Sequence, residues 1–132
     1  MSVVACDVAD AAQVRALVEG LEREGPVRGV VHAAGVEQLN PLMAGSAQEY
    51  GRVLAAKVGG ARHLDALFSE GSRAAELDAF VLFSSISGVW GSGGQGAYAA
   101  ANTYLDALAQ WRHARGLVAT SIAWGPWGGS GM

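Results

Sequence analysis

The chain has 132 residues, of which 51% are hydrophobic and 16% are charged, and its formal net charge is −3. This composition excludes an intrinsically disordered protein, because disorder goes with low hydrophobicity and high net charge. The nine lysine and arginine residues are scattered, which argues against a nucleic-acid-binding surface. No apolar run reaches the roughly 18 residues of a membrane-spanning helix. We therefore expect one globular domain over residues 1–132.

Cysteine and histidine usage argues against a disulfide framework and a metal centre. Cys6 is the only cysteine, so no internal disulfide can form, which fits a reducing compartment. The three histidines have neither mutual ligand spacing nor cysteine or carboxylate companions at ligand offsets. The N-terminus lacks the basic start of a signal peptide. The sequence thus predicts a cytoplasmic protein without a bound metal.

The first part of the chain predicts a strand, a helix and a second strand. Residues 3–6 form a short β-type run, and Asp10 is placed to cap a helix over residues 11–25. Apolar residues recur in that helix at i, i+3, i+4 and i+7, namely Val14, Leu17, Val18 and Leu21. Residues 27–35 form a nearly continuous apolar run, which is typical of a strand buried on both faces of a parallel sheet.

The rest of the chain continues the alternation. Ser46 and Glu49 have the spacing of a capping box and open a long helix through residue 71, which Gly59 and Gly60 would bend. A buried strand over residues 77–85, a helix over 97–116 and a last strand over 118–125 follow. This order predicts an α/β fold, a doubly wound parallel sheet of the Rossmann-like type. A G-x-G-x-x-G turn, which holds a pyrophosphate in such sheets, does not occur in the sequence.

Polar and small residues follow the predicted strands. In open parallel sheets ligands bind outside the carboxyl ends of the strands. Those ends carry Asp7, the run "HAAG" at 32–35, "FSS" at 83–85 and "WGPWGG" at 124–129. Tyr98 and Asn102 are four residues apart and so lie on one face of their helix. These segments are expected to converge on one crevice.

A tyrosine in such a crevice suggests acid catalysis. A phenol with a pKa near 10 is a poor acid at neutral pH, and a nearby ammonium group would improve it. Lys57 is the only lysine in the chain and so the sole candidate for that charge. Ser85 would supply a second hydroxyl to a substrate carbonyl oxygen as negative charge develops there. Taken singly, each of these residues is more often a packing, surface or turn residue.

As a set, Ser85, Tyr98-x-x-x-Asn102, "HAAG" and the intervening Lys57 resemble the ketoreductase domain of modular polyketide synthases, a branch of the short-chain dehydrogenase/reductase superfamily. Most of that superfamily has Y-x-x-x-K and an asparagine on the preceding helix, and the polyketide branch exchanges the two. This chain has the exchanged form. The resemblance covers essentially the whole chain.

The resemblance implies roles for these residues. Tyr98 would be the proton donor and Ser85 the hydrogen-bond donor to the carbonyl. Lys57 would tune Tyr98 and hold the cofactor ribose, with Asn102 as a supporting polar residue. The implied cofactor is NADPH, contacted by Asp7, Val8, Ala33, Ala34, Gly35, Lys57, Tyr98, Gly125, Pro126 and Trp127. Asp7 is equally well a turn or capping residue, and Trp124 and Trp127 could simply be packing residues.

The resemblance also implies a stereochemical class. Trp90 stands where the family's L-hydroxyl class carries a tryptophan, and residues 37–39 read Glu-Gln-Leu where the D-hydroxyl class carries Leu-Asp-Asp. Gln95, in place of a histidine, implies the subtype that does not select an epimerised α-substituent. The alternative for Trp90 is a residue that only caps its loop.

The implied activity is reduction of a β-ketoacyl thioester, tethered by phosphopantetheine to an acyl carrier protein, to a β-hydroxyacyl group. The implied partners are that carrier protein, the glycine-rich N-terminal half of the ketoreductase and the other synthase domains. The alternatives are a short-chain reductase of a free small ketone and a non-catalytic Rossmann-like remnant. Turnover by the isolated chain is not expected, because the missing turn would bind the pyrophosphate.

In the family's strand order, 3-2-1-4-5-6-7, the predicted strands correspond to strands 3 to 6. Strand 3 would stand about 14 Å from strand 4 if strands 1 and 2 were absent. Its unpaired backbone groups would be costly. We therefore expect residues 1–24 to repack against the edge of strand 4 or to be poorly ordered, and residues 27–126 to keep the family's core.

Overall fold

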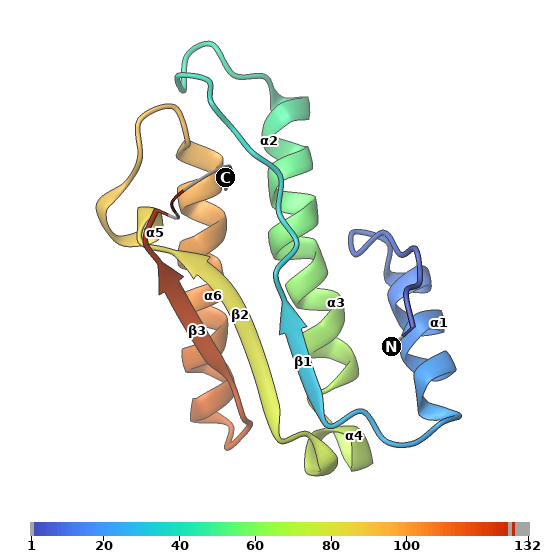
Figure 1. The fold of residues 1–132 in the computed structure, drawn as a ribbon. Coiled ribbons are helices and arrows are strands. Elements are labelled where there is room, and N and C mark those ends of the chain that lie inside the picture. Colours follow the sequence, from blue (N-terminus) through green and yellow to red (C-terminus); the bar gives the residue numbers. More distant parts are fainter. Residues whose placement is uncertain (1, 127, 129–132) are drawn as a thin grey trace.

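The computed structural model describes residues 2–126 and Gly128. In it three strands form one parallel sheet in the order β1-β2-β3 (Figure 1). They are β1 (Gly29–His32), β2 (Ala79–Ser85) and β3 (Thr120–Trp124). His32 lies opposite Leu82, and Ser85 lies opposite Trp124. The truncated, Rossmann-like parallel sheet is thereby confirmed.

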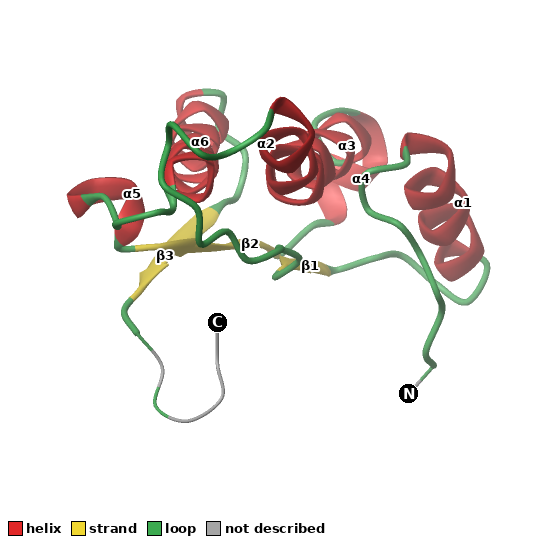
Figure 2. Ribbon diagram, turned by 90° about the horizontal axis from the view of Figure 1, so that it is seen from above, coloured by secondary structure: helices red, strands yellow, loops and turns green. Residues whose placement is uncertain are grey.

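Helices pack against one face of this sheet. The helical elements are α1 (Ala11–Glu22), α2 (Ala47–Leu54), the π-helical turn η1 (Ala55–Gly59), α3 (Gly60–Leu67), α4 (Gly71–Glu76), α5 (Ser87–Trp90) and α6 (Gly96–Ala114). Figure 2 shows α1, α2, α3 and α6 on the same side of the strands. Burial in β1 alternates accordingly, with Val30 buried and Val31 64% exposed. The expectation of strands buried on both faces is therefore wrong for β1, because no helix from the described part of the chain covers its second face.

The N-terminal segment departs from the sequence prediction in one respect. Residues 3–6 lie in coil rather than in a strand, and the side chains of Val3 and Val4 are 88% and 59% exposed. A strand exists only where neighbouring backbone completes its hydrogen bonds. In the described sheet, β1 pairs with β2 and with no segment on its other side.

Helix α1 forms as predicted but packs elsewhere than expected. The Asp10 side chain caps it, accepting hydrogen bonds from the backbone N–H groups of Ala12 (2.8 Å) and Gln13 (3.3 Å). Val14 and Val18 are buried in the core, and α1 lies beside α3 (Figure 1). Residues 11–22 are therefore ordered and pack on a helix. The expectation that they would lie on the strand edge or be poorly ordered is wrong.

The long central helix is confirmed in its start and changed in its middle. The Ser46 hydroxyl accepts a hydrogen bond from the Glu49 N–H at 3.1 Å, as the capping motif predicts. The helix then runs through α2, η1 and α3 and ends at Leu67, four residues before the expected end. In place of the expected bend at the two glycines there is a π-helical turn that contains Lys57.

A buried arginine connects the C-terminal ends of helices α3 and α6. Arg112, in the last turn of α6, has no exposed surface and forms an ion pair with Asp65 of α3. Its guanidinium also donates to the carbonyls of Phe68 and Val118, both at 3.1 Å. These contacts tie the end of α6 to the end of α3 and to the loop before β3. Together with the sheet they hold α6, which carries the candidate site residues.

Candidate active site

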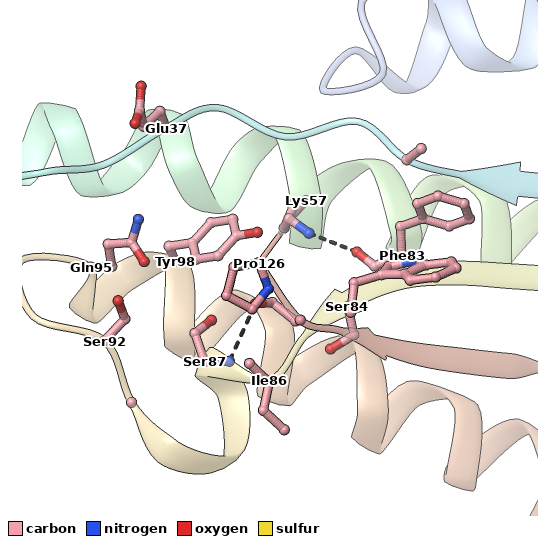
Figure 3. Close-up of a pocket in the computed structure, with 15 residues that line it drawn as sticks. Glu37, Lys57, Phe83, Ser84, Ile86, Ser87, Ser92, Gln95, Tyr98 and Pro126 are labelled. Atoms are coloured by element: carbon pink, nitrogen blue, oxygen red, sulfur yellow. Dashed lines mark hydrogen bonds between the residues drawn. The ribbon is translucent and has the colours of Figure 1, made fainter. Parts of the chain in front are cut away.

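A cavity of about 470 Å³ opens at the carboxyl ends of all three strands. Ala33 lines it after β1, Ser84 and Ser85 line it at the end of β2, and Gly125 and Pro126 line it after β3. Figure 3 shows Lys57 and Tyr98 reaching into the same space from the helical layer. The predicted convergence on one crevice is present for the ends of β1, β2 and β3 and for Tyr98, but not for Asp7.

Lys57 is the buried cation of this cavity. Its side chain projects from η1, and the residue is 4% exposed. The ammonium Nζ donates hydrogen bonds to the Phe83 carbonyl at 2.7 Å and to Asn102 Oδ1 at 2.8 Å. Burial lowers the pKa of Lys57 from 10.5 to about 8, and the Asp106 carboxylate opposes this shift. The ammonium group is therefore charged at neutral pH, and it loses its proton about one pH unit above neutrality.

Asn102 joins Lys57 to the helix that carries Tyr98. Asn102 is fully buried on α6, and both the oxygen and the nitrogen of its side-chain amide form hydrogen bonds. Oδ1 accepts from Lys57, while Nδ2 donates to the Tyr98 carbonyl at 2.8 Å and to Ser87 Oγ at 3.4 Å. The prediction that Tyr98 and Asn102 share a helix face is confirmed by this contact.

Tyr98 points its hydroxyl toward the Lys57 ammonium (Figure 3). The Lys57 Nζ lies 5.1 Å from the centre of the tyrosine ring. The first turn of α6 is held by Gln38, whose Oε1 accepts from the N–H groups of Ala97 (2.9 Å) and Tyr98 (3.2 Å). Sequence reasoning missed this cap, because Gln38 lies 60 residues before Tyr98 and has no local signature.

The two serines at the end of β2 have different partners. Ser84 is buried, and its hydroxyl donates to the Asn102 carbonyl at 3.2 Å. Ser85 is partly exposed, and its Oγ accepts from the Ser87 N–H at 3.2 Å. A hydroxyl that accepts a bond still has its own proton to donate. Ser85 is thus placed at the cavity with a proton available for a ligand.

The structure brings some of the predicted site residues together and leaves others apart. The cavity is lined by Ala33, Lys57, Ser85, Gln95, Tyr98, Gly125 and Pro126, and Asn102 lies directly behind it. The residues that do not line it are Asp7, Val8, Ala34, Gly35 and Trp90. Trp127 lies outside the described residues.

The residues away from the cavity have partners of their own. The Asp7 carboxylate accepts from the Ala9 N–H at 2.9 Å, which is a turn contact. Val8 packs against the core, and its carbonyl lies 3.1 Å from His63 Nδ1. Trp90 ends α5 with 81% of its surface exposed.

Some lining residues were not anticipated. Ser87 and Ser92 contribute to the cavity wall, and so does Glu37, which the sequence indicated only as part of a stereochemical marker. Phe83 was expected at this edge of the sheet, but the contact between its carbonyl and Lys57 was not. A backbone carbonyl carries no sequence signal, whereas the serines could have been suspected from the polar loop around them. Within the described residues no group of three or more histidine, cysteine or acidic side chains is arranged to hold a metal ion. None of the described helices is long and apolar enough to cross a membrane.

Comparison with known proteins agrees with this geometry. The family model described as "KR domain" matches residues 1–129. The chain is 56% identical over 131 residues to the polyketide synthase GfsA of Streptomyces halstedii, covering 98% of the chain and 2% of the synthase. It is 51% identical to the pikromycin polyketide synthase component PikAIII of Streptomyces venezuelae, covering 100% of the chain and 8% of that protein.

A solved structure shows the same fold. The PlmKR1 ketoreductase, from the first module of phoslactomycin biosynthesis in Streptomyces sp. HK803, superposes with a TM-score of 0.88 at 52% identity. The match covers 98% of this chain and 29% of that one. The chain therefore spans only a small part of the proteins it matches. It belongs to the ketoreductase domain family of modular polyketide synthases, within the short-chain dehydrogenase/reductase fold.

Proposed function

We propose that this chain carries the catalytic part of a ketoreductase that reduces a β-ketoacyl thioester to a β-hydroxyacyl thioester in polyketide biosynthesis, with NADPH as reductant. One observation carries the proposal: Tyr98, Lys57 and Ser85, from three separate elements, line the same cavity, and Asn102 bonds to the lysine behind it. A free small ketone as substrate and a non-catalytic remnant are supported by no comparable observation.

The cavity residues fit the chemistry of carbonyl reduction. Ser85 would donate its hydroxyl proton in a hydrogen bond to the ketone oxygen and so hold the carbonyl beside Tyr98. Tyr98 would transfer its phenolic proton to that oxygen, which completes the alcohol. Lys57 would stabilise the tyrosinate that remains, because its ammonium lies near the phenol. Asn102 would keep that ammonium in place.

The residues also fit the nicotinamide half of the cofactor. An ammonium group has three N–H donors, and Lys57 uses two of them on Phe83 and Asn102. The third could bind a ribose hydroxyl, with Ala33, Gly125 and Pro126 lining the space beside it. When bound, the nicotinamide supplies the hydride that reduces the carbonyl carbon and is itself oxidised. Contacts by Asp7, Val8, Ala34, Gly35 and Trp127 stay predictions, as does the preference for NADPH.

The substrate is proposed to arrive on phosphopantetheine attached to an acyl carrier protein. The support is that the curated relatives named above are polyketide synthases. The glycine-rich N-terminal half of the ketoreductase is the second proposed partner, because the pyrophosphate of a dinucleotide needs backbone donors of that kind.

Turnover tests the activity directly. The absorbance of NADPH is followed after a β-ketoacyl thioester is added to this chain together with the N-terminal half of the ketoreductase. We expect oxidation of NADPH that falls by about 10²- to 10⁴-fold in Tyr98→Phe, because the variant lacks the acidic proton. This chain without the other half should be inactive. Equal rates for the wild type and Tyr98→Phe would contradict the proposed role of Tyr98.

An L-configured hydroxyl is proposed for the product. Gln95 lines the cavity close to Tyr98 (Figure 3), whereas Trp90 is exposed at the end of α5. Chiral chromatography of the product from the wild type, Trp90→Leu and Gln95→His measures the contribution of each. We expect an L-product from the wild type and a mixed product from Trp90→Leu. A D-product from the wild type would contradict the assignment.

A further inference from the structure

The helix that carries Lys57 contains an irregular turn at the lysine itself. The π-helical turn η1 spans Ala55–Gly59, between the regular helices α2 and α3. A π turn holds one more residue than an α-helical turn, and such turns are frequent at functional sites. Each residue advances an α-helix by about 100°, so loss of the extra residue would rotate Lys57 by about that angle relative to one of the flanking helices.

A histidine from the sheet contacts this turn. His32, the last residue of β1, is 2% exposed, and its Nε2 lies 2.9 Å from the Lys57 carbonyl. A carbonyl oxygen only accepts hydrogen bonds, so Nε2 must carry the proton. Burial lowers the pKa of His32, which favours the neutral ring at pH 7. The hydrogen bond to the Lys57 carbonyl thus comes from strand β1 and not from the helix itself.

Gly60, the residue that follows η1, leaves space for the ring of His32. A Cβ atom added to Gly60 would lie 2.8 Å from His32 Cε1 and 3.1 Å from Val8 Cγ2. Both distances are shorter than ordinary van der Waals contact, so a larger residue would displace the imidazole or Val8. His32 and Gly60 thus fit one another at the junction of η1 and α3.

Lys57 is consequently held at both ends. Its carbonyl is bonded by His32 of β1, and its ammonium is bonded by Phe83 of β2 and Asn102 of α6. We propose that His32 is a positioning residue that fixes η1 in its π register and so directs Lys57 toward Asn102 and Tyr98. The catalytic meaning of this placement rests on the role proposed above for Lys57.

The titration of Lys57 tests the proposal without turnover. Lys57 is the only lysine, so a protein labelled with ¹³C and ¹⁵N lysine gives one side-chain signal by NMR. Glutamine places an amide donor close to the position of Nε2, whereas leucine provides none and asparagine is too short. The wild type and His32→Gln should titrate near 8, and His32→Leu and His32→Asn should titrate closer to 10.5. Circular dichroism establishes which variants are folded.

The outcomes separate this proposal from the proposed function. A folded His32→Leu or His32→Asn that still titrates near 8 would overturn the positioning role. Unfolding of both variants would also overturn it, because His32 would then be needed for the fold as a whole. In the assembled ketoreductase, His32→Leu should lower kcat by about 10²-fold, the cost of a misplaced catalytic group, and His32→Gln should restore it. A shifted titration with unchanged kcat would support the positioning role and contradict the role of Lys57 in catalysis.

Discussion

The cluster of Lys57, Asn102 and Tyr98 differs sharply from the segment of residues 2–10, although Lys57 and Tyr98 in the one and Asp7 and Val8 in the other were expected to contact one cofactor. Lys57 and Asn102 are 4% and 0% exposed, and each has partners on other elements. In the N-terminal segment Val3 is 88% exposed and the backbone is coil. The cluster is therefore fixed by contacts within this chain. In the N-terminal segment the exposed apolar surface lies at Val3 and Val4, before Val8 packs against the core.

The largest effect is expected from breaking the cluster at Asn102. Asn102→Leu keeps the branched shape and the number of side-chain heavy atoms but removes the acceptor at 2.8 Å from the Lys57 ammonium. A buried charge that loses a hydrogen-bond partner destabilises the fold, here by about 3 kcal/mol. Urea denaturation measures the free energy of unfolding. Gln110→Leu, an exposed position on the same helix, is the matched control and should change it by less than about 0.5 kcal/mol. Equal values for the two variants would refute the structural importance of the Lys57–Asn102 bond.

A smaller effect is expected when valine is replaced by alanine at a buried and at an exposed position of the N-terminal region. Val14 of α1 is 2% exposed, whereas Val3 is 88% exposed. Val14→Ala should lower the free energy of unfolding by about 2 kcal/mol, because it removes buried methyl groups and leaves a cavity. Val3→Ala should change it by less than about 0.5 kcal/mol. Similar losses at both positions would show that residues 2–6 are packed in solution.

The most gradual effect is the pH dependence that Lys57 imposes. Its pKa is about 8 in the folded protein and has the ordinary value of 10.5 in the unfolded chain. Between these values the unfolded state binds more protons, so the free energy of unfolding should rise with pH. The free energy of unfolding is measured against pH for the wild type and for Lys57→Met. Subtracting the second curve from the first cancels the contribution of the other titrating groups. Parallel curves from pH 7 to 10.5 for the two proteins would contradict the burial of a charged Lys57.

Short-range patterns predicted the local structure well. The four-residue spacing of Tyr98 and Asn102 predicted a shared helix face, and Asn102 Nδ2 does bond the Tyr98 carbonyl. Asp10 and Ser46 cap their helices as their positions predicted. Such signals are reliable because the interacting groups lie within one or two helical turns of each other. The prediction of a strand over residues 3–6 was wrong, because a strand depends on a partner that is distant in sequence.

The amino-acid sequence by itself determined the alternation of helices and strands, the parallel sheet and the residue types of the candidate site. Only the tertiary structure decided how those residues are held. Gln38 caps the helix of Tyr98, His32 binds the Lys57 carbonyl, and Phe83 accepts from the ammonium through its backbone. These contacts join segments 25 to 60 residues apart. Periodicity and capping motifs report on neighbours along the chain, whereas a buried polar group takes its partner from whichever element the fold brings beside it.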